Sequence, residues 1–192
     1  MPRAVLVSAT LLLLCAGCVS YSNLPDAIRV HGSIPQNTQT VSIQSLPMKR
    51  GAMMNVEDPL DPPLLLARSL KEVLARKRPG WKIEIDSGQA SPIRSDIAVR
   101  AEIVEVDGGS AGARFWIGFN AGAAQSTIRV SILDRAGKEL AVAPISHSTM
   151  CPLGWCTDSN KMMIQRNLQS LAEEVAEFVV NPSEYEKRKE AR

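Results

Sequence analysis

The sequence has few aromatic residues and no excess of charge of either sign. Phe, Trp and Tyr make up 4% of the 192 residues, and 22 basic against 20 acidic residues leave a formal net charge of +2 at pH 7. A charge balance this close to neutral offers no basic patch for nucleic acid. Walker and dinucleotide-binding glycine patterns are also missing, and no internal repeat occurs. We therefore expect neither a nucleic-acid partner nor a nucleotide cofactor.

Apolar runs of bilayer-spanning length are missing too. The run from Ala4 to Ala16 is about 13 residues long, whereas a spanning helix needs about 20. It begins directly after the basic Arg3, which is typical of a signal peptide.

The small pair Ala16-Gly17 precedes Cys18 at the end of this run. The segment resembles a bacterial lipoprotein signal, or lipobox, in which the cysteine after the cut receives fatty acyl chains such as palmitate. The resemblance implies that Cys18 is the lipidation site and the attachment to the membrane, because two or more acyl chains make a stable anchor. Cys15 stands where lipoboxes usually carry Leu, and it cannot be the acylated residue because Leu14 would fill the small-residue position.

The two residues after Cys18 are Val19 and Ser20, with no Asp. By resemblance to Gram-negative lipoproteins, this absence implies an outer-membrane protein that faces the periplasm. The alternative is an ordinary secreted protein that is cut by the general signal peptidase.

Four segments organise the chain. They are a signal peptide (1–17), the acylated cysteine with a flexible tether (18–37), a periplasmic domain (38–182) and a charged mobile tail (183–192). Removal of the signal peptide leaves 175 residues, enough for one domain with a core.

The first half of the domain predicts a strand, a helix and a strand. TVSIQSL (40–46) and WKIEI (81–85) alternate apolar and polar residues as half-buried strands do. Between them, Asp61 is the expected N-cap of a helix that begins with Pro62 and ends in the basic run Arg76-Lys77-Arg78, before Pro79-Gly80. We expect the two strands to be parallel.

The second half predicts an antiparallel meander and a helix. Its strands are a run from Ile97 with a bulge near Ile103, ARFWIGFNAG (113–122), STIRVSIL (126–133) and a run from Glu139. The helix starts after Asp158 and ends at Asn181-Pro182, with Glu173, Glu174 and Glu177 on its wet side. Its apolar stripe is Ile164, Leu168, Leu171, Val175 and Phe178. The expected fold class is α+β, a two-layer sandwich with two helices on one face of a mixed sheet.

The glycine-rich hairpin lies within GARFWIGFNAGAAQSTIRVSILDRAGKELA (112–141). The residues that carry a resemblance are Arg114, Gly118, Gly122 and the turn Asp134/Gly137-Lys138. On them the stretch resembles a group of uncharacterised bacterial outer-membrane lipoproteins, and the preceding strand–helix–strand is similar to small envelope-assembly and transport accessory proteins. The resemblance covers about 30 residues well. It implies a non-enzymatic accessory or binding module in cell-envelope assembly or transport, with another envelope protein as partner.

Three of the few aromatic residues, Phe115, Trp116 and Phe119, fall within five positions of this hairpin. Phe115 and Phe119 share one face of a strand, and Trp116 lies on the other. We interpret the three as partner-binding residues of a hairpin that contacts a partner or the membrane, and burial in the core is the alternative. In such a hairpin, Gly118 and Gly122 would permit a kink or a close approach of the backbone.

A catalytic interpretation rests on GGSAG (108–112), which fits the nucleophile pattern G-x-S-x-G, with Asp134 and His147 following in hydrolase order. That pattern needs a helix after the serine, and RFWIGF is instead typical of a strand. We expect no catalytic residue and no enzyme. A serine hydrolase that uses Ser110 and a purely structural envelope lipoprotein are the alternatives.

The remaining chemistry concerns Cys151 and Cys156, the two thiols that a mature lipoprotein would keep. Together with His31 and His147 they could bind a metal ion, but C-x₄-C with one distant histidine on each side is poor ligand spacing. We expect no metal. The periplasm is oxidising, so CPLGWC predicts a disulfide between the two cysteines.

Overall fold

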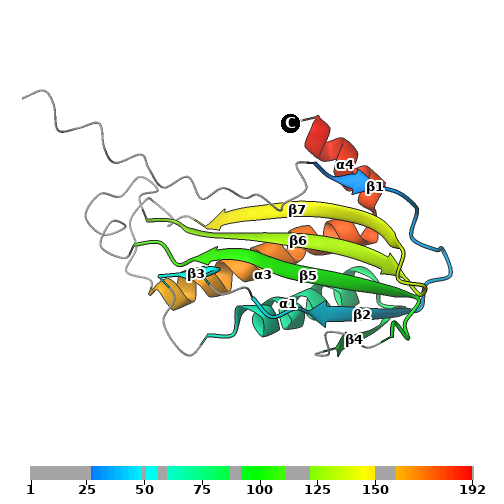
Figure 1. Cartoon of the computed structure of the whole chain (residues 1–192), viewed down its shortest axis with the longest axis horizontal. Helices are drawn as coiled ribbons and strands as arrows, with labels where there is room; N and C mark the ends of the chain where they lie inside the picture. The colour runs from blue at the N-terminus through cyan, green and yellow to red at the C-terminus, as the bar shows by residue number, and fades with distance from the viewer. Residues whose placement is uncertain are drawn as a thin grey trace, which may run out of the picture.

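The computed structural model describes residues 27–48, 51–55, 60–86, 92–110, 122–149 and 159–191. In these residues the chain forms one mixed sheet of seven strands with helices packed against it (Figure 1). The strands are β1 (Arg29–Val30), β2 (Thr40–Ser45), β3 (Met53–Met54), β4 (Lys82–Asp86), β5 (Ile97–Asp107), β6 (Ala124–Asp134) and β7 (Glu139–Thr149), and the helices are α1 (Pro62–Lys77), α3 (Asn160–Val180) and α4 (Pro182–Glu190). The strand order is β1-β7-β6-β5-β2-β4, with β3 beside β5. The predicted α+β class is confirmed.

The predicted strand–helix–strand unit is present as β2, α1 and β4. Asp61 caps α1, because its side chain accepts a hydrogen bond from the Leu64 amide at 3.1 Å, and Pro62 is the first helical residue. β2 and β4 are parallel, with Val41 opposite Ile83. β5 pairs in parallel with the other edge of β2, so β2 is a central strand of the sheet.

The meander consists of β5, β6 and β7. β5 pairs antiparallel with β6, with the predicted bulge between Ile103 and Glu105, and β6 pairs antiparallel with β7. The prediction that residues 113–122 form the strand next to β5 is wrong. β5 is paired on one side with β6 and on the other with β2 and β3, so the strand that contains STIRVSIL takes that position. Residues 111–121 lie outside the described part of the chain.

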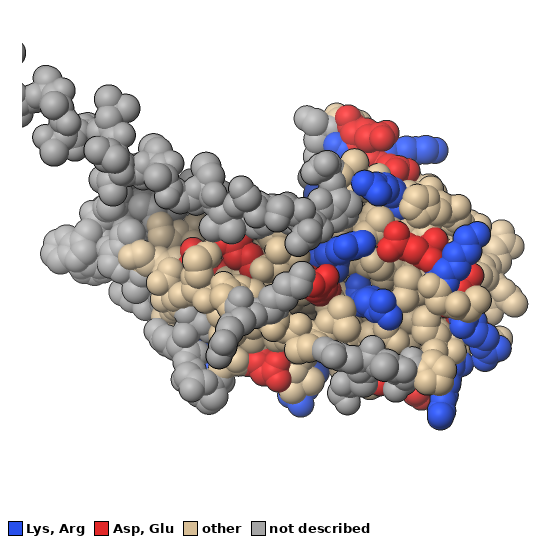
Figure 2. Space-filling view, viewed as in Figure 1, with Lys and Arg blue, Asp and Glu red and all other residues tan. Residues whose placement is uncertain are grey.

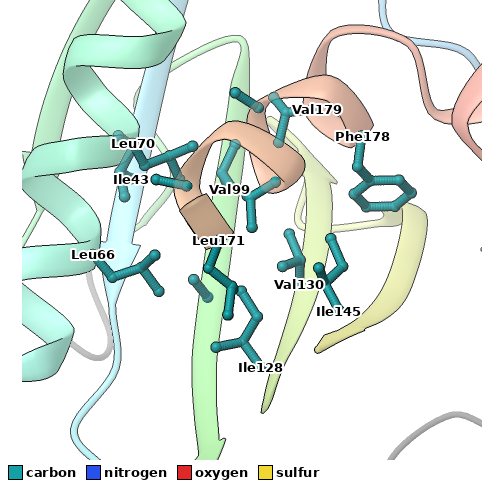
Figure 3. Close-up of a cluster of buried hydrophobic side chains, with 14 of the residues drawn as sticks. Ile43, Leu66, Leu70, Val99, Ile128, Val130, Ile145, Leu171, Phe178 and Val179 are labelled. Atoms are coloured by element: carbon teal, nitrogen blue, oxygen red, sulfur yellow. The ribbon is translucent and has the colours of Figure 1, made fainter. Parts of the chain in front are cut away.

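The core lies between the sheet and the two long helices. All five residues of the predicted stripe on α3 are buried. Leu171 and Phe178 point from α3 toward Val130 and Ile145 of the sheet, and Leu66 and Leu70 of α1 extend the same layer (Figure 3). The N-cap of α3 is Ser159, which accepts a hydrogen bond from the Met162 amide at 3.3 Å, rather than the expected Asp158.

The flexible tether predicted over residues 18–37 is wrong in its second part. β1 pairs antiparallel with β7, with Arg29 opposite Val142, and the amides of His31 and Gly32 both donate to the Leu140 carbonyl, at 2.7 and 3.0 Å. The domain therefore begins before residue 38. The signal for β1 is weak in the sequence, since its pairing partner lies more than a hundred positions away.

The mobile tail predicted over residues 183–192 is also wrong, because the chain continues as α4. Asn181 caps the end of α3 and the start of α4 at once. Tyr185 of α4 is only 3% exposed and meets the ring of Phe178 edge-on, with centroids 5.4 Å apart. A helix this polar has no apolar stripe of its own, so its contact with α3 holds it in place.

Charged side chains of both signs are intermixed on the face of the domain drawn in Figure 2. The basic end of α1 pairs with the acidic face of α3, through Arg76 with Glu173 and through Lys77 with Glu177 at 3.9 Å. None of the helices described has the length and hydropathy to cross a membrane.

Candidate functional site

The predicted site residues Cys18, Phe115, Trp116 and Phe119 and the pair Cys151 and Cys156 all lie outside the described residues. The structure does describe the residues that flank the predicted hairpin. Residues 108–110 follow β5 and residues 122–123 precede β6, so the two ends of segment 111–121 lie at the same end of the sheet (Figure 1).

Glycines allow these two ends to touch through their backbones. Gly109 has φ +68°, and a Cβ built on it would lie 2.1 Å from the carbonyl oxygen of Gly122. Gly122 has φ +74°, and its Cβ would lie 2.3 Å from the carbonyl oxygen of Ser110. Only glycine combines this backbone conformation with so close an approach. The predicted close approach at Gly122 is confirmed, whereas Gly118 lies outside the described residues.

Two asparagines brace this glycine stem, by which we mean residues 107–110 and 122–123. Asn55 adopts φ +52°, and its side-chain amide donates to Asp107 Oδ1 at 2.8 Å. The same oxygen accepts the Gly109 amide at 2.8 Å. From the start of α3, Asn160 donates to the Asn55 carbonyl at 3.0 Å. The stem is thus held by β3 and by α3 as well as by its own strands.

Sequence reasoning missed both asparagines. Asn55 lies 52 positions from Asp107, and Asn160 lies 105 positions from Asn55. The only local signal is that asparagine tolerates the left-handed conformation better than most residues. Neither residue stands in a pattern that predicts its partner.

The structure does not bring together the residues of the serine-hydrolase interpretation. Ser110 lies in the stem, beside the end of the sheet where Asp107 pairs with Gln125. Asp134 lies nine residues further along β6, about 30 Å away at roughly 3.4 Å per residue. Its carboxylate accepts the amides of Ala136 and Lys138, both at 2.9 Å. It therefore serves the β6–β7 turn and does not orient His147.

His147 instead belongs to a second polar cluster, around Glu174 of α3. Its Nδ1 lies 4.0 Å from Glu174 Oε2. Glu174 Oε1 accepts the Tyr185 hydroxyl at 2.8 Å and pairs with Lys189 of α4. These side chains line a pocket of 380 Å³ between β7, α3 and α4. The expectation that Glu174 is on the wet side of α3 is therefore wrong, since its side chain is 20% exposed and has partners on β7 and α4.

The side chains of this cluster hold α4 against α3. Burial, followed by the nearby Glu174 carboxylate, raises the pKa of Tyr185 well above its ordinary value of 10.0. The phenol therefore stays protonated and donates its hydrogen bond. Across the described ranges, no group of three or more His, Cys, Asp or Glu side chains is placed to hold a metal ion.

The part of the chain that contains most of the sheet and the glycine stem matches a known family. Residues 42–151, more than half of the chain, match the model of a domain of unknown function, DUF4410. The chain belongs to this family. The DUF4410 region runs from β2 to just beyond β7 and includes the predicted hairpin, which agrees with the resemblance to a family without an assigned function.

The DUF4410 chain is also similar to solved structures at low identity. It is 13% identical to a PelC dodecamer from Paraburkholderia phytofirmans, which covers 77% of this chain and 94% of that one with a TM-score of 0.46. It is 16% identical to a candidate lipoprotein from Caulobacter crescentus, with 65% and 83% coverage and a TM-score of 0.36. None of the curated proteins compared with the chain matches it significantly.

Proposed function

We propose that this protein is an outer-membrane lipoprotein, acylated at Cys18 and facing the periplasm, that acts as a non-enzymatic accessory in cell-envelope assembly or transport. The lipobox-like segment supports the anchor. In the domain, the glycine stem is the observation that supports the binding role, because it holds the two ends of segment 111–121 together on a base braced from β3 and α3.

The proposed partner-binding residues Phe115, Trp116 and Phe119 belong to segment 111–121. A rigid base lowers the conformational entropy that a loop loses when it binds. Loops on rigid scaffolds are also where binding residues concentrate. We therefore assign contact with another envelope protein to segment 111–121.

The anchor is tested by substitution of each leader cysteine. Cys18→Ser should abolish acylation and lipoprotein-type processing, because the thiol is the acyl acceptor. Cys15→Ser is the matched control and should leave both intact. Labelled palmitate in the Cys18→Ser protein would contradict the proposal.

The partner is tested by crosslinking in intact cells and identification of the captured proteins. Shortening segment 111–121 to a brief Gly/Ser linker between Ser110 and Gly122 should remove the captured partner, while the thermal unfolding transition of the domain persists. Capture of the same partner by the shortened, folded protein would place the contact elsewhere.

The same preparations distinguish the alternatives. A serine hydrolase would react with a fluorophosphonate probe, and Ser110→Ala would abolish the reaction. The distance between Ser110 and Asp134 argues against that outcome. A purely structural lipoprotein would give neither probe labelling nor a captured partner that depends on the hairpin.

A further inference from the structure

Among the described residues, the large apolar side chains that are exposed are all methionines at one end of the domain. Met53 and Met54 of β3 are 40% and 36% exposed, and Met162 in the first turn of α3 is 44% exposed. The hydrogen bond from Asn160 to the Asn55 carbonyl joins the start of α3 to the end of β3. We call Met53, Met54 and Met162 the methionine surface.

An apolar groove of 890 Å³ continues this surface past Met53. It lies where β2 ends and α1 begins. The apolar side chains that line it include Leu46, Pro47, Met48, Leu60, Pro63 and Leu64. The glycine stem lies at the same end, since the Gly108 amide donates to the Met54 carbonyl at 3.0 Å. One end of the domain thus combines exposed apolar side chains with a groove lined mainly by apolar residues.

The direction of β1 relates the end with the methionine surface to the proposed anchor at Cys18. β1 is antiparallel to β7, and Ala27 and Ile28 lie beside Pro144, Ile145 and Ser146. From Val30 back to Ala27, the chain therefore runs in the direction of the end of β7 at Thr149. That is the end of the sheet where the glycine stem and the methionine surface lie.

The chain between Cys18 and Ala27 is short, so the proposed anchor stays close to the domain. Residues 18–26 span at most about 30 Å when fully extended, and roughly 17 Å as a flexible chain. The end of β7 lies five residues past Pro144, about 17 Å along the strand. This reach is long enough for an acylated Cys18 to lie beside the end of β7 at Thr149, and a bilayer that holds it there would meet the methionine surface at high local concentration.

We propose that the methionine surface rests in the lipid surface that holds the acyl anchor, at the boundary between headgroups and acyl chains. The proposal rests on acylation of Cys18. Methionine is flexible, unbranched and apolar, so it adapts to a fluid surface without a fixed complementary shape. The anchor is what favours a phospholipid surface as the occupant, because it keeps lipid within reach of this end of the domain.

The contact is tested by photo-crosslinking in cells. The full chain carries p-benzoylphenylalanine in place of Met54 or of Met162, and the matched control carries it in place of Ala136, an exposed residue of the β6–β7 turn at the opposite end of the sheet. After irradiation, the protein is purified and its mass is measured by mass spectrometry. We expect adducts of phospholipid mass at positions 54 and 162 and none at position 136. Thermal unfolding verifies that each replaced chain is folded.

Adducts with protein alone at positions 54 and 162 would overturn the proposal in favour of a protein partner. Folded chains without any lipid adduct at these positions would overturn it as well, and so would equal lipid adducts at position 136. The mass of the N-terminal peptide in the same samples reports acylation of Cys18. An unacylated Cys18 is a failure of the proposed function, whereas an acylated Cys18 without lipid adducts is a failure of the membrane contact alone.

Discussion

Substitution of Gly122 by alanine tests the geometry of the glycine stem most directly. A residue with a Cβ pays about 1–2 kcal/mol for a left-handed backbone, and Gly122 has φ +74°. Its Cβ would also lie 2.3 Å from the Ser110 carbonyl oxygen, so the backbone of the stem must shift. Overpacking of this kind typically costs a further 1–3 kcal/mol or so. We therefore expect Gly122→Ala to lower the free energy of unfolding by roughly 2–5 kcal/mol.

Gly137 in the β6–β7 turn provides a matched control. Its φ is +81°, and a Cβ there would meet nothing within 4 Å. Gly137→Ala should therefore cost only the backbone strain, about 1–2 kcal/mol. The difference between the two variants isolates the contact in the stem.

Urea unfolding followed by circular dichroism measures both costs, provided that the dependence on urea is the same for both proteins. If the two variants differ by less than about 0.5 kcal/mol, the scatter of ordinary surface substitutions, the close approach in the stem is wrong. In the crosslinking experiment, Gly122→Ala should also weaken capture of the partner, whereas Gly137→Ala should leave it unchanged.

Three further measurements test the core, the sheet edge and the cysteines. Leu171→Ala should lower the free energy of unfolding by about 2–5 kcal/mol, because Leu171 is 0% exposed in the core, whereas the exposed Gln169→Ala should leave the urea midpoint nearly unchanged; equal shifts would contradict the packing. The carboxylate of Asp96 accepts hydrogen bonds from two β2-side amides and a hydroxyl, which lower its pKa below 3.8. Its stabilising effect is therefore present above the pKa of the unfolded chain and is lost as the pH falls through the folded-state pKa. Asp96→Asn should lower stability at pH 7 and lose this effect in strong acid; a difference that does not change between these pH values would refute the argument. Cys151 and Cys156 should be found as a disulfide by mass spectrometry of the protein isolated from cells without reductant. The disulfide should contribute about 2 kcal/mol on the chain-entropy model, and two thiols that are alkylated without reductant would exclude it.

The predictions from sequence were most accurate where the signal is local. The ends of α1 followed from Asp61, Pro62 and the Pro79-Gly80 pair, because capping and helix termination depend on neighbours within one turn. The buried stripe of α3 and the bulge after Ile103 followed from apolar periodicity alone. Each of these features depends on residues that are close together in the sequence, so it could be predicted without knowledge of the fold.

The features that were missed depend on contacts between distant segments. α4 is polar throughout, and its position comes from Tyr185 against Phe178 and from Lys189 with Glu174 of α3. β1 is two residues long, and it forms a strand because it pairs with the edge strand β7. The neighbour of β5 was misassigned for the same reason, since several segments have strand character and only the assembled sheet decides which of them pairs there.

The same division holds for the candidate site. The sequence by itself predicts lipidation at Cys18 and contact through Phe115, Trp116 and Phe119, and it pointed to a close backbone approach at Gly122, because signals and glycine-rich turns are recognised over short stretches. Only the tertiary structure decided that Asn55 and Asn160 brace the stem, that Asp134 lies far from Ser110, and that the exposed methionines of the described residues lie at the same end of the domain as the stem. Those relations arise when strands and helices far apart in the chain pack on one core, and no local pattern specifies them.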